Sequence, residues 1–158
     1  MTLDDLVSRD MVDDDLVQVL SIERNTQPMP WSRLSFEESL NNQYRCQVIE
    51  YQSSVVAFYI VCPVVDEMHI LNLAVAPQHQ GNGLGHVLMQ EIVAMALALR
   101  LDSIFLEVRA GNSVAQSLYN KWQFEQIAVR KDYYRTRDKK REHAVVMVRK
   151  LSGESAPA

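Results

Sequence analysis

The chain has 158 residues, of which 47% are hydrophobic, and this is enough for one domain with a buried core. The formal net charge of -4 gives no general attraction to nucleic acid, although the segment at residues 130–141 is locally basic. The acidic N-terminus lacks the pattern of a secretory signal, and the most apolar segment, residues 87–101, is too short to cross a bilayer, so we expect a cytoplasmic protein.

The first part of the chain predicts two helices. Three aspartates at residues 13–15 suit the N-terminus of a helix that runs to about residue 25. Four side chains follow them at helical spacing: Leu16, Val19, Leu20 and Glu23. Ser35 and Glu38 then form a capping-box pattern, which predicts a short second helix to about Asn42.

A β-hairpin is expected next. "YRCQVIEY" and "SSVVAFYIVC" are rich in β-branched and aromatic residues, and Gln52 and Ser53 provide a turn between them. Pro63 is expected to end the second strand.

The central part predicts a strand, a loop, a helix and a second strand. "EMHILNLAV" is followed by a glycine-rich loop, a helix from about Gly83 to Arg100, and the strand "SIFLEV". This order requires a right-handed crossover between two parallel strands. A helix in "NSVAQSLYNKW" and two strands in "FEQIAVR" and "EHAVVMVRK" close the chain. We therefore expect an α/β (α+β) fold, with a mixed sheet in one domain over residues 1–151 and a disordered tail over 152–158.

Three of the five glycines, Gly81, Gly83 and Gly85, lie at the junction between the central strand and its helix. Main-chain N–H groups at a helix start bind phosphate, and glycine allows a close approach. A purely structural glycine turn is the competing interpretation. The segment has no Walker motif, and a dinucleotide fingerprint is weak because His86 occupies the place of its third glycine, although Asp102 lies near the distance expected for a ribose carboxylate.

The stretch "LNLAVAPQHQGNGLGHVLMQ" resembles the cofactor motif of the GCN5-related N-acetyltransferases (GNAT family), whose pattern Q/R-x-x-G-x-G/A is matched by Gln80, Gly83 and Gly85. The order of elements is also similar to that family along nearly the whole chain. Within it, "PWS", "LEVRAGNSVAQSLY" and "RKDYYR" resemble the RimI branch, the ribosomal-protein alanine N-acetyltransferases.

The resemblance implies a fold in which acetyl-CoA lies beside a central pair of splayed parallel strands. Leu73, Ala74 and Val75 would then face the pantetheine and thioester, with an N–H near Leu73 stabilising the oxyanion. Six consecutive residues would hold the pyrophosphate through their main chain, without magnesium: Gly81, Asn82, Gly83, Leu84, Gly85 and His86.

The resemblance also implies the catalytic residues. Glu107 matches the family's general base, Tyr119 its general acid, and Asn112 a residue that contacts the cofactor. From the residues alone, Glu107 is more typical of a surface glutamate at a strand end than of a base. Asn112 and Tyr119 would also suit a helix cap and a core tyrosine. Many relatives have a glycine where Gln123 follows the catalytic tyrosine, so a left-handed turn is less favourable here.

Aromatic residues in loops are candidates for the acceptor side. Trp31, Tyr133 and Tyr134 would hold a peptide N-terminus, and packing is the alternative. The basic run at residues 130–141 is interpreted as a solvated hairpin tip, with contact to an RNA-bound target or to the CoA phosphate as the alternatives. We expect no metal, because the four histidines show no ligand spacing, and we expect Cys46 and Cys62 to be reduced, buried thiols.

The implied function is acetyl transfer from acetyl-CoA to the N-terminal alanine of a ribosomal protein, the eighteenth of the small subunit, directly within a ternary complex. One alternative keeps the fold and changes the acceptor to a lysine, a polyamine or another small amine. A second alternative is a non-catalytic module that binds acyl-CoA. We expect no membrane partner and no direct nucleic-acid partner, and a monomer or weak dimer.

Overall fold

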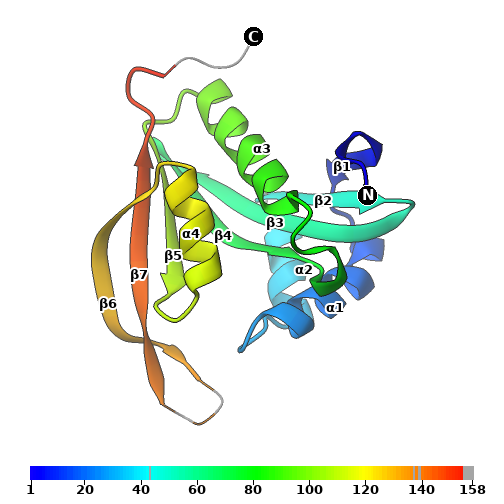
Figure 1. Cartoon of the computed structure of the whole chain (residues 1–158), viewed down its shortest axis with the longest axis horizontal. Coiled ribbons are helices and arrows are strands. Elements are labelled where there is room, and N and C mark those ends of the chain that lie inside the picture. The colour runs from blue at the N-terminus through cyan, green and yellow to red at the C-terminus, as the bar shows by residue number, and fades with distance from the viewer. Residues whose placement is uncertain (43, 137, 139, 155–158) are drawn as a thin grey trace. The chain divides into compact units, whose positions relative to one another are not determined.

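The computed structural model describes residues 1–42, 44–136, 138 and 140–154. Within these residues, seven strands form one sheet in the order β1-β2-β3-β4-β5-β7-β6, accompanied by four α-helices (Figure 1). β4 pairs with β5 in parallel, whereas β1–β2, β2–β3, β5–β7 and β6–β7 are antiparallel pairs. The predicted mixed sheet with one central parallel pair is confirmed.

The chain divides into two compact units, one formed by residues 1–62 and 72–88 and the other by residues 63–71 and 89–158. The single domain expected over residues 1–151 stays a prediction. Residues 152–154 form a turn, and the rest of the expected tail, residues 155–158, lies outside the described residues.

In the first unit, helix α1 (Leu16–Thr26) follows a 3₁₀ turn, and α2 (Arg33–Asn41) comes after a short loop. The predicted inward face of α1 is confirmed, because Leu16, Val19, Leu20 and Glu23 are buried. Ile22, which was not predicted, is buried as well. The predicted cap of α2 was wrong by three residues. Ser32 is the cap, because its hydroxyl accepts a hydrogen bond from the N–H of Ser35 at 3.2 Å. The 3₁₀ turns are η1 (Leu3–Asp5), η2 (Asp13–Asp15) and η3 (Pro77–His79).

Strands β2 (Arg45–Tyr51) and β3 (Ser54–Val64) form the predicted hairpin. Gln52 and Ser53 both have positive φ, 50° and 65°, as the tight two-residue turn between twisted strands requires. The expectation that Pro63 ends β3 was wrong. The pairing with β2 already ends at Val61, so the missing N–H of Pro63 removes no bond between these two strands.

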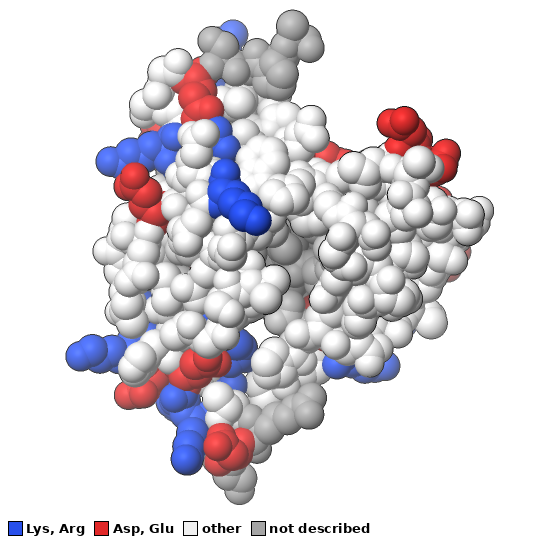
Figure 2. Space-filling view, viewed as in Figure 1, with Lys and Arg blue, Asp and Glu red and all other residues white. Residues whose placement is uncertain are grey.

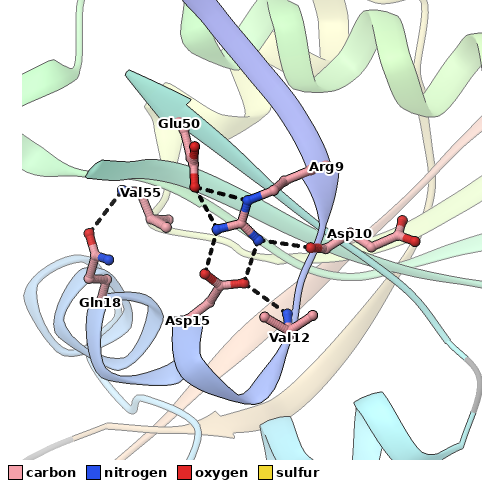
Figure 3. Close-up of polar contacts among 7 residues, drawn as sticks. All are labelled: Arg9, Asp10, Val12, Asp15, Gln18, Glu50 and Val55. Carbon is pink, nitrogen blue, oxygen red and sulfur yellow. Dashed lines mark hydrogen bonds and ion pairs between the residues drawn. The ribbon is translucent and has the colours of Figure 1, made fainter. Parts of the chain in front are cut away.

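The edge strand β1 (Leu6–Asp10) was not predicted, and a cluster of charges attaches it to the first unit (Figure 3). The guanidinium of Arg9 donates to both oxygens of Asp15, at 2.7 and 2.8 Å, and to Glu50 Oε1, at 2.6 and 2.9 Å. Asp15 also accepts from the N–H of Val12 at 2.8 Å. These bonds join β1, η2 and β2.

The core of the first unit is a cluster of apolar side chains around α1, α2 and the hairpin. Phe36 on α2 is fully buried, and its ring lies 5.2 Å from that of Trp31 and 5.6 Å from that of Phe58. Leu16, Val19, Val48 and Ile60 complete its centre, each fully excluded from solvent. This core fixes the loop that carries Trp31.

Strand β4 (Glu67–Val75) and helix α3 (Leu84–Ala98) each contribute residues to both units. In the second unit, β4 runs parallel to β5 (Ser103–Arg109), with His69 opposite Phe105. The rings of these two residues stack at 4.9 Å. The predicted order of strand, loop, helix and strand is confirmed.

Helix α4 (Ser113–Lys121) and the hairpin of β6 (Glu125–Arg135) and β7 (Arg141–Lys150) complete the second unit. β6 is longer than predicted, because the pairing with β7 shifts register between Arg130 and Tyr134 and then continues. Asp132 has a φ of 52° within this irregularity. The two tyrosines predicted to lie in a loop therefore lie in β6.

Candidate functional site

The glycine loop connects β4 to α3 within the first unit. Gly81 and Gly83 have φ of 81° and 85°, a conformation that side chains of L-residues disfavour. A Cβ at Gly81 would have no neighbour within 4 Å, and one at Gly83 would meet only the side chain of Leu3, at 4.0 Å. The glycines are therefore required by backbone conformation, and they leave space in front of the loop.

Two amide side chains form hydrogen bonds with the main chain of this loop and of the strand before it. Gln80 Nε2 donates to the carbonyl of Val75 at 3.1 Å, and Asn82 Nδ2 donates to the carbonyl of His79 at 3.1 Å. Among the predicted cofactor residues, Asn82 thus uses its side chain to hold the turn, which leaves its main chain for a ligand.

The start of α3 has the geometry of an anion site. The bond from the N–H of Val87 to the carbonyl of Gly83, at 3.2 Å, begins the helical series. The N–H groups of Leu84 and Gly85 precede it and lack an acceptor within the helix. Leu84 is buried and anchors the helix, whereas His86 is exposed. The helix dipole adds partial positive charge at this end.

The carboxyl end of β4 leads directly into the loop. Ala74 is buried, whereas Leu73 and Val75 are half-buried, and their expected contact with the cofactor stays a prediction. The N–H of Ala76 donates to the carbonyl of Val56 at 2.8 Å and so ties the strand end to β3.

Trp31 lies in the loop between α1 and α2, and a buried carboxylate holds its main chain. Glu23 Oε2 accepts from the N–H of Trp31 at 2.9 Å, and both oxygens of Glu23 accept from Asn72 Nδ2 at 3.1 Å. Burial raises the pKa of the Glu23 carboxyl above its ordinary value, and the bonds from Trp31 and Asn72 act against this effect.

In the second unit, Glu107 lies on β5 with its side chain 19% exposed. Burial alternates along this strand, so Glu107 shares a face with Phe105. Glu107 Oε1 is 3.3 Å from Nη1 of Arg130 on β6. The carboxylate is therefore half-shielded from solvent and paired with a cation.

Tyr134 lies at the centre of a group of charged and aromatic side chains. The guanidinium of Arg109 stands over its ring at 4.4 Å, that of Arg130 stands over the ring of Tyr133 at 5.0 Å, and the two tyrosine rings meet edge to face at 5.1 Å. Burial, and then the charge of Glu107, raises the pKa of Tyr134 to about 12.

Tyr119 is buried on α4, and its ring lies 5.7 Å from that of Phe124. Burial raises the pKa of Tyr119 far above its ordinary value, and the charge of Tyr134 adds to this effect. The phenol therefore stays protonated throughout the neutral pH range.

Asn112 caps α4, as its position at the helix start predicted. Its Oδ1 accepts from the N–H of Ala115 at 3.1 Å, and the residue is exposed. Its expected contact with the cofactor stays a prediction. Next to it, the N–H of Gly111 donates to Glu142 Oε2 at 2.8 Å, and Arg109 Nη1 lies 3.5 Å from the other oxygen of that carboxylate.

The model of the acetyltransferase (GNAT) family matches residues 16–124, which include β4, the glycine loop, Glu107 and Tyr119. The chain belongs to this family.

Members of the GNAT family with curated functions are similar to the chain over nearly their whole length. A [ribosomal protein bS18]-alanine N-acetyltransferase from Haemophilus ducreyi is 33% identical, over 87% of this chain and 94% of its own. The enzyme of the same name from Escherichia coli K12 is 32% identical, over 87% and 93%. The crystal structure of the ribosomal-protein-S18-alanine N-acetyltransferase from Escherichia coli superposes with a TM-score of 0.87 at 29% identity, over 97% of this chain and 98% of that one.

The basic segment of this GNAT protein is only partly a solvated hairpin tip. Arg130 pairs with Glu107, and the carbonyl of Arg135 accepts from Arg109 at 3.0 Å. Residues 137 and 139 lie outside the described residues. Figure 2 shows blue and red side chains together at the lower left, where Figure 1 places the tip of β6 and β7, so the charge there is mixed.

Glu23 is the residue of the acetyltransferase that sequence reasoning did not assign to the site. It occupies an inward position of α1, at helical spacing from apolar residues, and this was the available signal. A carboxylate at a core position needs partners, but the sequence alone did not identify Trp31 and Asn72 as those partners.

The two cysteines were predicted to be buried thiols. Cys46 is buried, but Cys62 is only half-buried. Among the described residues, no group of three or more His, Cys, Asp or Glu side chains is arranged to hold a metal ion. Within the same part of the chain, every helix is too short or too polar to span a membrane.

Proposed function

We propose that this GNAT protein is an acetyl-CoA-dependent Nα-acetyltransferase whose acceptor is the N-terminal alanine of a ribosomal protein. The relatives' names specify bS18, the eighteenth protein of the small subunit, and we propose the same target here. The observation that carries this proposal is the 33% identity over 94% of the length of the Haemophilus ducreyi enzyme. Since ribosomal proteins are made and assembled in the cytoplasm, the proposal also places the enzyme there.

The loop before α3 holds the pyrophosphate of acetyl-CoA. Main-chain N–H groups of residues 81–86 supply the hydrogen bonds, and the absence of side chains at Gly81 and Gly83 permits close approach. The helix dipole offsets part of the negative charge, so this arrangement requires no magnesium. Leu73, Ala74 and Val75 flank the pantetheine, and an N–H near Leu73 stabilises negative charge on the thioester oxygen.

Glu107 acts as the general base. The α-amino group of a peptide has a pKa of about 8 and is mostly protonated near neutral pH, so a base must accept its proton before the nitrogen attacks. Glu107 takes that proton directly or through water, and its half-buried position on β5 supports this role.

Tyr119 donates its O–H to the departing sulfur as the new C–N bond forms and the C–S bond breaks. The phenol of Tyr119 is protonated at neutral pH, as an ordinary tyrosine is, and is therefore present as a donor. Transfer is direct in a ternary complex: burial raises the pKa of the Cys46 thiol to about 11, which makes it a poor nucleophile for a covalent acetyl-enzyme. Trp31, Tyr133 and Tyr134 hold the N-terminus of the acceptor, and Asn112 contacts the cofactor.

A pair of peptides tests the proposal. One begins with the first residues of bS18 and has a free N-terminal alanine, and its twin is blocked at the N-terminus and carries a lysine. We expect acetylation of the first peptide only. Preference for the blocked twin would show that the acceptor is a lysine side chain and not an N-terminal alanine. Binding of acetyl-CoA without turnover of any amine would indicate a non-catalytic module.

A further inference from the structure

Glu23 is a buried carboxylate that the reaction described above does not use. It is 1% exposed, and its three hydrogen bonds come from neutral donors, the N–H of Trp31 and the side-chain amide of Asn72. These partners come from segments far apart in the sequence, and all three residues belong to the first unit.

Packing alone does not explain a carboxylate at this position. The other inward residues of α1 are apolar: Leu16, Val19, Leu20 and Ile22. Removing a carboxylate from water is costly, and an apolar side chain of similar volume usually serves a core at least as well. What Glu23 provides, and an apolar residue would not, is a connection between two main-chain segments.

The two connected segments are those to which the proposed function assigns the acceptor and the thioester. Trp31 immediately precedes Ser32, the cap of α2, and its ring packs on Phe36 at 5.2 Å. Asn72 immediately precedes Leu73 on β4, where the oxyanion is expected. Helix α1 also contacts the turn η3 at the start of the glycine loop. One carboxylate therefore sets the position of the Trp31 loop relative to this strand.

We propose that Glu23 is a positioning residue that holds the acceptor-binding loop on β4 through Trp31 and Asn72. Its kinetic consequence rests on the proposed function. Glu23→Leu removes both connections and leaves the N–H of Trp31 and the amide of Asn72 without this acceptor. Glu23→Gln retains one carbonyl oxygen of the same shape and should restore part of the effect. Asn72→Leu removes only the connection to β4.

The kinetic test compares these variants with Ile22→Ala. This substitution leaves a cavity in the core beside the same helix and does not remove the hydrogen bonds that Glu23 accepts from Trp31 and Asn72. For Glu23→Leu we expect the KM of the alanine peptide to rise about tenfold or more, while the Kd of acetyl-CoA changes less than about twofold. Glu23→Gln should lie between Glu23→Leu and the wild type. Asn72→Leu should raise the peptide KM, and Ile22→Ala should lower the melting temperature without a change in peptide KM.

A second measurement follows Trp31 itself, in a Trp122→Phe background that leaves one tryptophan. Acrylamide should quench the fluorescence of Trp31 more strongly in Glu23→Leu than in Asn72→Leu or Ile22→Ala. If Glu23→Leu leaves both the peptide KM and the quenching at the values of Ile22→Ala, Glu23 is a core residue only. If the wild type acetylates no alanine peptide, the proposed acceptor is wrong, and the quenching comparison still decides the positioning role. Should Glu23→Leu fail to fold, Glu23→Gln and Asn72→Leu provide the same comparisons.

Discussion

The carboxylate of Glu107 lies 3.3 Å from the guanidinium of Arg130, which also stands over the ring of Tyr133 at 5.0 Å. One cation thus joins the proposed base on β5 to a proposed acceptor-binding residue on β6. These contacts connect the β6–β7 hairpin to β5 within the second unit.

Replacing the proposed base should reduce turnover without affecting the cofactor. Glu107→Gln keeps the side chain's shape but cannot accept a proton, so kcat should fall by roughly 10- to 10⁴-fold. The Kd of acetyl-CoA, measured by calorimetry, should stay at the wild-type value. Glu125→Gln, an exposed glutamate on β6, is the control and should retain full activity. Undiminished turnover by Glu107→Gln would eliminate the residue as the base.

Substitution of Gly83 in the glycine loop should weaken acetyl-CoA binding, whereas substitution of Gly153, another glycine with positive φ, should not. Gly83 and Gly153 both have φ of 85°, so an alanine at either position costs about 1–2 kcal/mol of backbone strain. Only Gly83→Ala should also weaken acetyl-CoA binding, because only that residue lies in the proposed phosphate loop. Calorimetric titration of both variants checks this, and equal affinities would place the pyrophosphate elsewhere.

The loss of stability on acidification should depend on the Arg9–Asp15 pair. Hydrogen bonds from Arg9 lower the pKa of Asp15 below its ordinary value, despite the opposing effect of burial. A carboxyl whose folded pKa is lowered stabilises the fold above its unfolded pKa of about 4, and this contribution is lost as the pH falls through the folded pKa.

Asp15→Asn should therefore lower the free energy of unfolding by about 1–3 kcal/mol at neutral pH and flatten its decline below about pH 4. Urea unfolding across this range measures both effects. The exposed neighbour provides the control, since Asp14→Asn should follow the wild-type curve. Parallel curves for Asp15→Asn and the wild type would show that the pair does not contribute.

Replacing Gln123, at the end of the helix that carries Tyr119, with glycine should stabilise the fold. Gln123 has a φ of 67°, so the chain adopts the left-handed conformation here although glutamine makes it less favourable than the glycine of many relatives. Gln123→Gly should raise the free energy of unfolding by about 0.5–1 kcal/mol, since relief of strain exceeds the added chain entropy. Ser117→Gly, within α4, should instead lower it by roughly 0.5 kcal/mol. Thermal unfolding of the two variants measures the difference in sign.

Local sequence patterns predicted the elements whose side chains alternate or repeat clearly. The hairpin turn at Gln52 and Ser53, the order from β4 to β5 and the cap at Asn112 all follow from such patterns, and the structure confirms them. Strand β1 was missed because only Leu6 and Arg9 among its residues are half-buried and the rest are exposed, so it has no apolar face. Its position depends on antiparallel pairing with β2 and on the ion pairs of Arg9 with Asp15 and Glu50, which no local pattern reveals.

The site residues divide in the same way. The glycine loop lies at the junction of β4 and α3, where the sequence placed it, and Gly81 and Gly83 have positive φ. The bonds of Glu23 to Trp31 and Asn72, and the pairing of Arg130 with Glu107, join residues from different elements. Such contacts depend on tertiary packing, so spacing along the chain did not predict them.

Mass spectrometry of protein N-termini tests the central claim most directly. Cells that lack this protein are compared with cells that carry the wild type or Glu107→Gln. The account predicts that the N-terminal alanine of bS18 carries an acetyl group only in cells with the wild-type protein. Full acetylation of bS18 in cells that lack the protein, or in cells whose only copy is Glu107→Gln, would contradict it.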